Sequence, residues 1–321
     1  MFGWRWFLGA VLIMIGVGVH AAVQPAPPVV LFDSRGFETD AGYDPRFTLD
    51  GQMDWIAQGT GGNGLVTNYF TGRGQQAYIG YNPPLSVEEA LNVWRPVNLA
   101  PTRLQLPLVT FTVTMEIVDS TTNRYDDFRW SVYNTNGHRL FTLDFDNFTG
   151  AVSYGLDDTN GFVNTGFTFA NDGAYDLRLD MNFAANTWSA ALNDVVIVNA
   201  KRMTTVGAEL NLGDIDAVWA IRDPQNPGDN FMVFDDYKIV GQPVEAVPAR
   251  LLSLGLLPDR GHLMRLLGEP GKSYAVEVSD DLSRWRSVRT NTASLPGGIF
   301  EFLDDRATNQ PIRFYRARLL D

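Results

Sequence analysis

Cysteine is absent from the 321 residues, and histidine occurs only three times. The lack of cysteine excludes disulfide bonds, thiolate metal sites and cysteine nucleophiles. His20 lies in an N-terminal apolar segment, which leaves His138 and His262 far apart along the rest of the chain. Spacing alone does not exclude a serine–histidine–acid triad, but the sequence contains no Gly-x-Ser-x-Gly nucleophile elbow.

Long apolar runs are equally scarce. One cationic residue, Arg5, precedes the apolar run at residues 7–19, and small residues follow at Ala21 and Ala22. This run is shorter than the roughly 20 residues that a membrane-spanning helix needs. Residues 1–22 are therefore predicted to be a signal peptide, with the mature chain beginning near Val23. No later segment is apolar enough to span a membrane, so we expect no transmembrane segment after signal removal. An exported chain without cysteine is typical of a bacterial protein that is secreted, periplasmic or on the cell surface.

Charge is distributed unevenly along the chain. The formal net charge is −12, but residues 23–248 carry −15 and residues 249–321 carry +2. The acidic part should repel nucleic acid and anionic membranes, so no nucleic-acid partner is expected. Glycans, a cell-surface polymer or cations remain compatible with this charge.

Proline-rich stretches divide the sequence. Residues 23–28 read as an extended lead-in, and residues 242–249 combine two prolines with the change in charge. The predicted organisation is therefore a large domain at residues 29–241, a linker at 242–249 and a small domain at 250–321.

Apolar and polar residues alternate through most of the large domain, with a period of two. Such runs are short, rich in β-branched and aromatic residues, and bounded by Asn, Asp and Gly, as strands are. They lie at residues 109–117, 128–133, 141–146, 152–156, 167–169, 175–192 and 231–239. One buried and one solvated face per strand indicates antiparallel sheets. The predicted fold is all-β, a two-sheet antiparallel jelly-roll sandwich followed by a small β-sandwich.

Two further expectations concern individual segments of this domain. Residues 86–91 are the one predicted helical turn, with Ser86 as its N-cap. The alternation also assigns Trp130 and Trp219 to the core.

The sequence patterns resemble a known superfamily. The stretches FDSRGFE (32–38), DLRLDMNFAANTWSAALND (176–194) and DNFMVFDDYKIV (229–240) resemble the concanavalin A-like lectin/glucanase superfamily, and in particular the laminin-G-like jelly rolls of secreted bacterial proteins. The tail, with KSYAVEVSDDLSRWRSV (272–288), FEFLDD (300–305) and IRFYRARLL (312–320), resembles a small β-sandwich module that closes many such proteins. Trp285 is expected to be a core aromatic of that module. A fold of this kind hosts lectins, hydrolases, lyases and spacers, so the resemblance implies fold rather than activity.

Glycoside hydrolysis needs two carboxylates roughly 5–9.5 Å apart. The nearest candidate pairs are Glu116 with Asp119, whose spacing places them on opposite faces of a strand, and Asp214 with Asp216, which have no glutamate nearby. No catalytic residue is therefore assigned. Lyase chemistry by a tyrosine or lysine base leaves no short signature and stays open.

Glycan binding needs aromatic faces and polar groups that fix hydroxyls. Candidate ligand-binding residues are two aromatics in a Gly- and Asn-rich region and a polar set on the solvent side of the middle strands: Trp55, Trp94, Arg129, Tyr133, Asp144 and Asp146. The alternative for the two tryptophans is burial beneath the loop. The alternative for the polar set is an ordinary solvent-exposed sheet face without a ligand. The predicted function is a secreted, non-catalytic carbohydrate- or surface-binding protein. A carbohydrate-active enzyme (glycoside hydrolase or polysaccharide lyase) and a purely structural envelope protein are the alternatives.

Calcium is the expected inorganic partner, because hard cations take carboxylate oxygens. The resemblance implies a structural ion between the first and last strands, with Glu38 and Asp235 as its ligands. Alternation assigns Asp235 to the apolar face shared by Phe231, Val233 and Tyr237, where a carboxylate needs a partner. Hydrogen bonds from backbone amides would satisfy it equally well.

Overall fold

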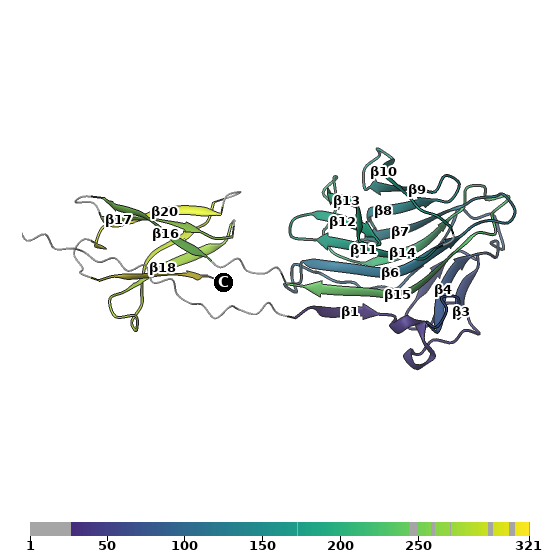
Figure 1. Ribbon diagram of the computed structural model, residues 1–321, viewed down its shortest axis with the longest axis horizontal. Coiled ribbons are helices and arrows are strands. Elements are labelled where there is room, and N and C mark those ends of the chain that lie inside the picture. The colour runs from purple at the N-terminus through teal and green to yellow at the C-terminus, as the bar shows by residue number, and fades with distance from the viewer. Residues whose placement is uncertain are drawn as a thin grey trace, which may run out of the picture. The chain divides into compact units, whose positions relative to one another are not determined.

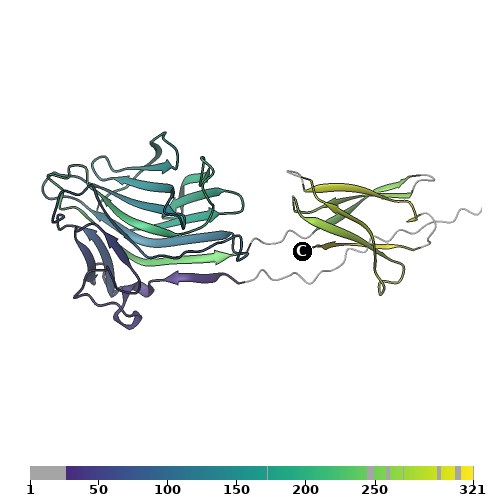
Figure 2. The same ribbon diagram turned by 180° about the vertical axis from the view of Figure 1, so that it is seen from behind.

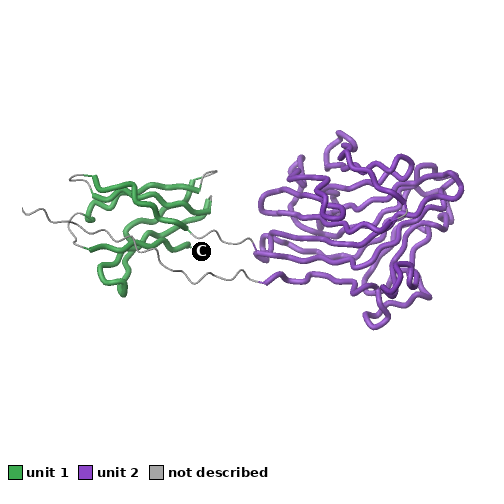
Figure 3. Tube along the Cα trace, viewed as in Figure 1, with its two compact units in different colours: residues 1–25, 245–321 green, residues 26–244 purple. Residues whose placement is uncertain are grey.

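The computed structural model describes residues 27–171, 173–243, 249–257, 261–269, 271–294, 298–307 and 312–320. The chain divides into two compact units, one of residues 26–244 and another that holds the described residues from 249 onward (Figure 3). The predicted signal peptide and most of the predicted linker lie outside the described residues. No helix in the described ranges is long and apolar enough to cross a membrane.

The larger unit consists of two antiparallel sheets. The eight-stranded sheet has the order β13 (Val195–Arg202), β12 (Thr187–Leu192), β11 (Tyr175–Asn182), β6 (Leu108–Val118), β15 (Phe231–Gln242), β4 (Gln75–Gly80) and β3 (Asn63–Thr67), with β1 (Val29–Asp33) also paired with β15. The seven-stranded sheet has the order β10 (Phe162–Thr168), β9 (Ala151–Leu156), β8 (Arg139–Asp146), β7 (Asp127–Tyr133), β14 (Asp214–Ala220), β5 (Ala90–Trp94) and β2 (Ile56–Gln58). Figures 1 and 2 show β1, β15 and β6 running side by side. Two stacked antiparallel sheets are the arrangement that the sequence predicts.

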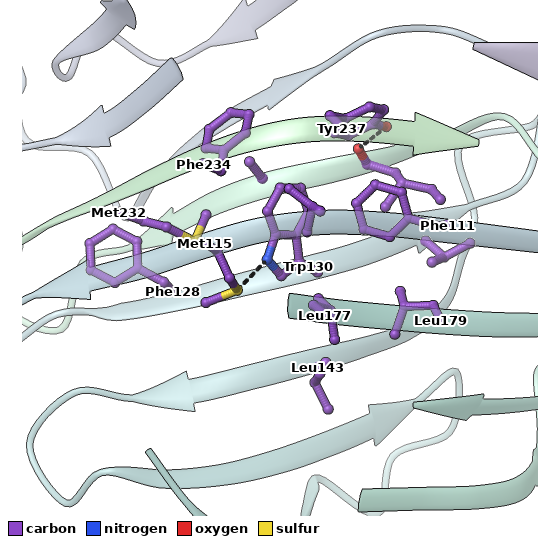
Figure 4. Packing of buried hydrophobic residues seen from close by; sticks show 14 of the residues in the cluster. Phe111, Met115, Phe128, Trp130, Leu143, Leu177, Leu179, Met232, Phe234 and Tyr237 are labelled. Atoms are coloured by element: carbon purple, nitrogen blue, oxygen red, sulfur yellow. Dashed lines mark hydrogen bonds between the residues drawn. The ribbon is translucent and has the colours of Figure 1, made fainter. Parts of the chain in front are cut away.

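The core between these sheets is formed by the apolar members of each alternating run (Figure 4). Trp130 and Trp219 are both fully buried, as predicted. The indole Nε1 of Trp130 on β7 lies 3.1 Å from the sulfur of Met115 on β6, and the hydroxyl of Tyr237 on β15 donates to the carbonyl of Ile215 on β14 at 2.9 Å. Both bonds link one sheet to the other. They therefore help to fix β7 and β14, two central strands of the seven-stranded sheet, against the eight-stranded sheet.

A β-bulge in β15 overturns the predicted position of Asp235. The register of β15 against β6 shifts between Asp235 and Lys238, and Asp236 has a φ of 52°. The extra residue reverses the alternation, so Phe234 and Tyr237 both enter the core while Asp235 faces outward. Asp235 is nevertheless only 1% exposed, and the segment with η1 (Arg35–Phe37) lies against β15 and β4 beside it.

Two other predictions were wrong. Residues 86–89 form no helical turn: the Ser86 hydroxyl donates to the Glu88 carboxylate at 2.9 Å, and β5 begins at Ala90. Pairing of β5 with β14 outweighs the local helical preference. Trp285 is not in the core of the smaller unit, since it is half-buried beneath the guanidinium of Arg316 at 4.2 Å.

The smaller unit also consists of antiparallel strands. One sheet contains β16 (Arg250–Leu257), β17 (Gly261–Leu267) and β20 (Ile299–Asp304), and the other contains β19 (Arg286–Thr292), β18 (Ser273–Ser279) and β21 (Phe314–Leu319). Its buried cluster consists of Met264, Leu266, Tyr274, Val276, Ala293, Phe300 and Phe302. This arrangement confirms the predicted small β-sandwich.

Candidate functional site: the polar face of the seven-stranded sheet

The outer face of the seven-stranded sheet carries a continuous set of polar side chains, which we call the polar face. In each strand these residues alternate with core residues, and pairing of β7 with β8 and β14 brings them together. The polar face comprises Asp127, Arg129, Ser131, Tyr133, Thr142, Asp144, Asp146, Asp214 and Asp216. The predicted ligand-binding residues on the middle strands therefore share one surface; their role in binding stays a prediction.

A row of short side chains crosses the middle of the polar face. Gly155 on β9 pairs with Thr142 on β8, which pairs with Ser131 on β7, which pairs with Asp216 on β14. The hydroxyls of Ser131 and Thr142 lie 2.6 Å apart, and both residues are buried. Larger side chains flank the row, with Arg129 on one side and Tyr133 on the other. The row is therefore low and largely covered by the taller side chains on either side.

Ion pairs organise the Arg129 side of the polar face. The Nε of Arg129 donates to Asp144 at 2.6 Å, and its guanidinium lies 5.1 Å from the ring centre of Phe162 on β10. Burial raises the pKa of Asp144, although the Arg129 charge opposes that rise. Arg222, which follows β14, donates to Asp127 at 2.6 Å and lies 2.5 Å from Asp146. Arg129 and Arg222 are thus both engaged by carboxylates.

Asp214 and Asp216 form a pair of acids on β14. Ile215 between them is buried in the core, so both carboxyl groups stand on the polar face. Burial raises the pKa of Asp214 to about 6, and burial together with the charge of Asp214 raises the pKa of Asp216 to about 9. Each carboxyl group is a hydrogen-bond partner of the other. Asp216 is only 6% exposed, and its Oδ1 has no hydrogen-bond partner among the described residues.

The two predicted tryptophans are placed differently. Trp94 ends β5 on the same face as Asn92, and it is half-buried. It directly follows Val93, which pairs with Ala217, so it lies in the strand next to Asp216. Trp55, in contrast, is 1% exposed in the core, where its Nε1 donates to the hydroxyl of Tyr43 at 3.0 Å. The ring of Trp55 is therefore not available to a ligand, and that prediction was wrong.

A pocket of about 330 Å³ adjoins the Arg222 end of the polar face. Its lining residues are Arg124, Tyr125, Asp126, Arg222, Asp223 and Asn226. The ring of Tyr125 contacts that of Phe148 at 5.6 Å, and Phe148 is 67% exposed. Asp126 is fully engaged, because it accepts bonds from the Trp219 indole and from the amides of Arg222 and Gly228. The pocket is thus lined by one aromatic ring, two arginines, two aspartates and one asparagine.

The predicted metal ligands lie near each other beside the eight-stranded sheet, with Asp235 on β15 and Glu38 in the segment that follows β1. A Cβ built on Gly36 would lie 3.6 Å from the Asp235 Oδ1 and 3.7 Å from the Glu38 Oε1, so both carboxylates face this glycine. Pairing of β1 with β15 brings the first and last strands together, as expected. The described residues contain no cluster of three or more acidic or histidine side chains that could hold a metal.

Two residues close to Glu38, Ser34 along the chain and Gln75 through a hydrogen bond from its amide, carry buried neutral oxygen atoms. Ser34 Oγ and Gln75 Oε1 are buried without hydrogen-bond partners among the described residues. Glu38, Asp235, Ser34 and Gln75 together offer oxygen atoms, the type that calcium prefers. Such an ion would join β15 to the segment after β1. The buried Asp235 carboxylate already has hydrogen-bond donors without a metal, because it accepts bonds from the Asp236 amide at 2.8 Å and from Gln76 at 3.3 Å.

Sequence reasoning did not assign the acid pair of the polar face, or the neighbouring Arg222, to a binding surface. Asp214 and Asp216 were considered only as hydrolase carboxylates, and Arg222 was not considered. The i, i+2 spacing on an alternating strand is a usable signal for the acid pair, since it places both side chains on one face. No local signal indicates Arg222, because its partners Asp127 and Asp146 are distant in sequence.

No family model and no curated protein matches the chain. One solved structure similar to it is a sialidase, with a TM-score of 0.44 and 9% identity; the match covers 60% of this chain and 17% of the sialidase. Another is a carbohydrate esterase from Shiga toxin-encoding bacteriophage phi24B, with a TM-score of 0.44 and 10% identity; the match covers 68% of this chain and 100% of the esterase. A third is basic winged bean lectin with Tn-antigen, with a TM-score of 0.43 and 9% identity; the match covers 67% of this chain and 99% of the lectin. The chain thus spans about a sixth of the sialidase but nearly the whole of the other two. With TM-scores below 0.5, these likenesses assign no activity to the chain.

Proposed function

We propose that this protein is a non-catalytic glycan-binding protein, and that its ligand lies across the polar face of the seven-stranded sheet. Sugars are bound by aromatic faces and by polar groups that fix hydroxyls. Trp94, Asn92 and Tyr133 supply these chemical types on one surface with the acids of β14. The pocket lined by Tyr125 and Arg222 extends the surface at one end.

The sparsely bonded carboxyl group of Asp216 carries this proposal. Buried polar groups in proteins nearly always satisfy their hydrogen-bonding capacity, and one that does not calls for an explanation. Among the described residues the Asp216 carboxyl group has only its neighbour Asp214 as a hydrogen-bond partner, and it stands in the row of short side chains beside Ser131. A hydroxyl-rich ligand at the edge of that row would give this carboxyl group a further partner.

The geometry of the acid pair favours binding over hydrolysis. A glycosidase needs its two carboxyl groups roughly 5–9.5 Å apart, with the scissile bond between them. The pKa of Asp216 is raised by its neighbour Asp214, so the two carboxyl groups lie side by side on one face of β14 rather than on either side of a bound sugar. Lyase chemistry by Tyr133 is also disfavoured: burial and the neighbouring Asp216 raise its pKa, whereas a general base works best with a pKa near the operating pH.

The proposal places the protein outside the cytoplasm, as its predicted signal peptide implies, with glycans or a cell-surface polymer as partner. A purely structural role would leave the polar face without a ligand. Binding and structural roles therefore differ in one measurable property, affinity for a glycan.

Screening the full mature chain on a glycan array, followed by calorimetric titration, tests the proposal. Trp94→Ala should weaken binding at least about tenfold, since aromatic residues contribute strongly to such contacts. Trp285→Ala is a matched control, because that half-buried tryptophan belongs to the smaller unit. Absence of binding to every glycan, or equal losses in the two variants, would argue for a structural protein or for a different binding surface.

A further inference from the structure

We propose that the polar face selects neutral glycans, and that Asp216 binds them as a protonated carboxyl group donating a hydrogen bond to a ligand oxygen. This inference rests on the proposed function and adds the class of ligand and the protonation state of the residue that contacts it. It follows from the surroundings of the acid pair, from the hydrogen-bonding capacity of Asp216 and from the charges of the polar face.

The acid pair has no cationic partner among the described residues. Tyr133 on β7 and Trp94 on β5 flank it, Thr142 lies farther along the row on β8, and the buried hydroxyl of Tyr237 lies on the core side. The nearby guanidinium of Arg129 is bonded to Asp144 at 2.6 Å.

Arg139 on β8, a third arginine beside the polar face, donates to the backbone carbonyl of Leu156 at 3.1 Å. Two buried carboxyl groups without a counter-charge cannot both ionise at moderate cost, so the pair retains a proton.

The retained proton changes what Asp216 can do. An ionised carboxylate only accepts hydrogen bonds, whereas a protonated one also donates. The raised pKa values of Asp214 and Asp216 agree with one shared proton at neutral pH, held chiefly by Asp216. In the free protein the shared proton lies between the two acids, so a ligand oxygen has to replace Asp214 as its acceptor. The pair then offers the ligand a donor on Asp216 and an acceptor on Asp214.

The charges of the polar face disfavour an anionic ligand. Five aspartates contribute to it: Asp127, Asp144, Asp146, Asp214 and Asp216. Arg129 and Arg222 are already paired with three of these carboxylates. Over the acid pair a uronate or sulfate group would therefore gain neither of these two arginines, and a neutral sugar would avoid that cost. Arg139, bonded to a carbonyl, and Arg124, in the pocket, form no ion pair among the described residues, so they remain cations at the margins of the face.

The test measures binding of the full mature chain to neutral polysaccharides (laminarin, xyloglucan, galactomannan) and to anionic ones (polygalacturonate, alginate) from pH 5 to pH 10. We expect binding to at least one neutral polymer at pH 7, a loss of about tenfold toward pH 10, and much weaker binding of both anionic polymers. Tenfold corresponds to the loss of one good hydrogen bond.

Two substitutions of Asp216 show whether binding depends on a hydrogen-bond donor at this position or only on a side chain of this size. Asp216→Asn keeps an N–H donor in the same place, so binding at pH 7 should stay within about threefold and should no longer fall toward pH 10. Asp216→Ala removes the donor and should lose about tenfold at pH 7. Asp180→Asn makes the same chemical change on the eight-stranded sheet and should leave binding unaltered.

Asp214→Asn provides a second test that does not depend on altering Asp216. It removes the neighbouring charge that raises the pKa of Asp216, so the loss of binding should shift to lower pH. If Asp216→Asn loses as much binding as Asp216→Ala, or if anionic polymers bind as tightly as neutral ones, the inference is wrong and the proposed function still stands. If the folded protein binds no polymer at any pH, the proposed function itself fails.

Discussion

The carboxylate of Glu38 lies in the space that a side chain on Gly74 would occupy. A Cβ built on Gly74 would lie 1.7 Å from the Glu38 Oε1, and Gly74 has a φ of +73°. The same oxygen accepts a hydrogen bond from the amide of Gln75 at 3.0 Å. The glycine thus allows the chain entering β4 to close directly over the carboxylate of the candidate cation site.

Replacing this glycine should destabilise the larger unit. Gly74→Ala adds backbone strain and a collision with Glu38, and we expect a loss of about 2–4 kcal/mol in the free energy of unfolding, measured by urea denaturation. Gly72→Ala is a matched control, since Gly72 has a φ of +80° but a Cβ added there would meet nothing within 4 Å. It should lose only about 1 kcal/mol. Equal losses in the two variants would show that the contact with Glu38 contributes nothing.

Asp216→Asn should make the protein more stable at alkaline pH. The pKa of Asp216 is raised to about 9 in the folded state, so the folded protein binds more protons than the unfolded chain between about pH 4 and pH 9. Stability of the wild type therefore falls as pH rises through this window. An uncharged amide avoids that loss, and we expect a gain on the order of 2 kcal/mol at pH 8, or about 4–8 °C in Tm.

The gain should disappear below the unfolded pKa, because both carboxyl groups are then protonated in either state. Thermal melts of wild type and variant at pH 3.5 and pH 8 measure the difference. A variant with the same advantage at both pH values would show that repacking, rather than ionisation, is responsible.

Strand alternation predicted much of this fold because most strands have one face in the core. β6, β7, β8, β11 and β12 are all present close to their predicted bounds. The failures are local departures from that pattern. At β15 the positive φ of Asp236 accompanies a β-bulge, and the sequence pattern there does not predict that bulge.

The candidate site was predictable only in part, for a similar physical reason. Arg129 and Asp144 were grouped correctly because β7 and β8 are consecutive strands of one hairpin. Asp216 joins them through pairing of β14 with β7, which are distant in sequence, and periodicity cannot specify such pairing. Trp55 was misassigned because its loop folds back into the core, where Tyr43 accepts its indole hydrogen.

The exported protein should begin near Val23. Small residues precede this position and an apolar run precedes them, as signal peptidase requires. N-terminal sequencing of protein recovered from outside the cytoplasm checks this directly. Recovery of a chain that still begins at Met1 would support a membrane anchor instead.

Limited proteolysis should cut the predicted linker at residues 242–249 first, since proline-rich connections between domains make few contacts. Mass spectrometry of the fragments would then show a resistant product close to residues 29–241. Early cleavage within that range, with residues 242–249 intact, would place the boundary elsewhere.

Calcium should stabilise the larger unit through Glu38 and Asp235. A ligand that binds only the folded state at about 100 times its Kd adds roughly 2.7 kcal/mol, or about 5–11 °C in Tm for a domain of this size. Thermal melts with excess calcium and with EGTA measure that shift, which Glu38→Gln and Asp235→Asn should each reduce. Asp40→Asn is the control, because the exposed Asp40 carboxylate bonds Arg35 instead. If calcium and EGTA give the same Tm, the bonds from the Asp236 amide and Gln76 satisfy Asp235 without an ion.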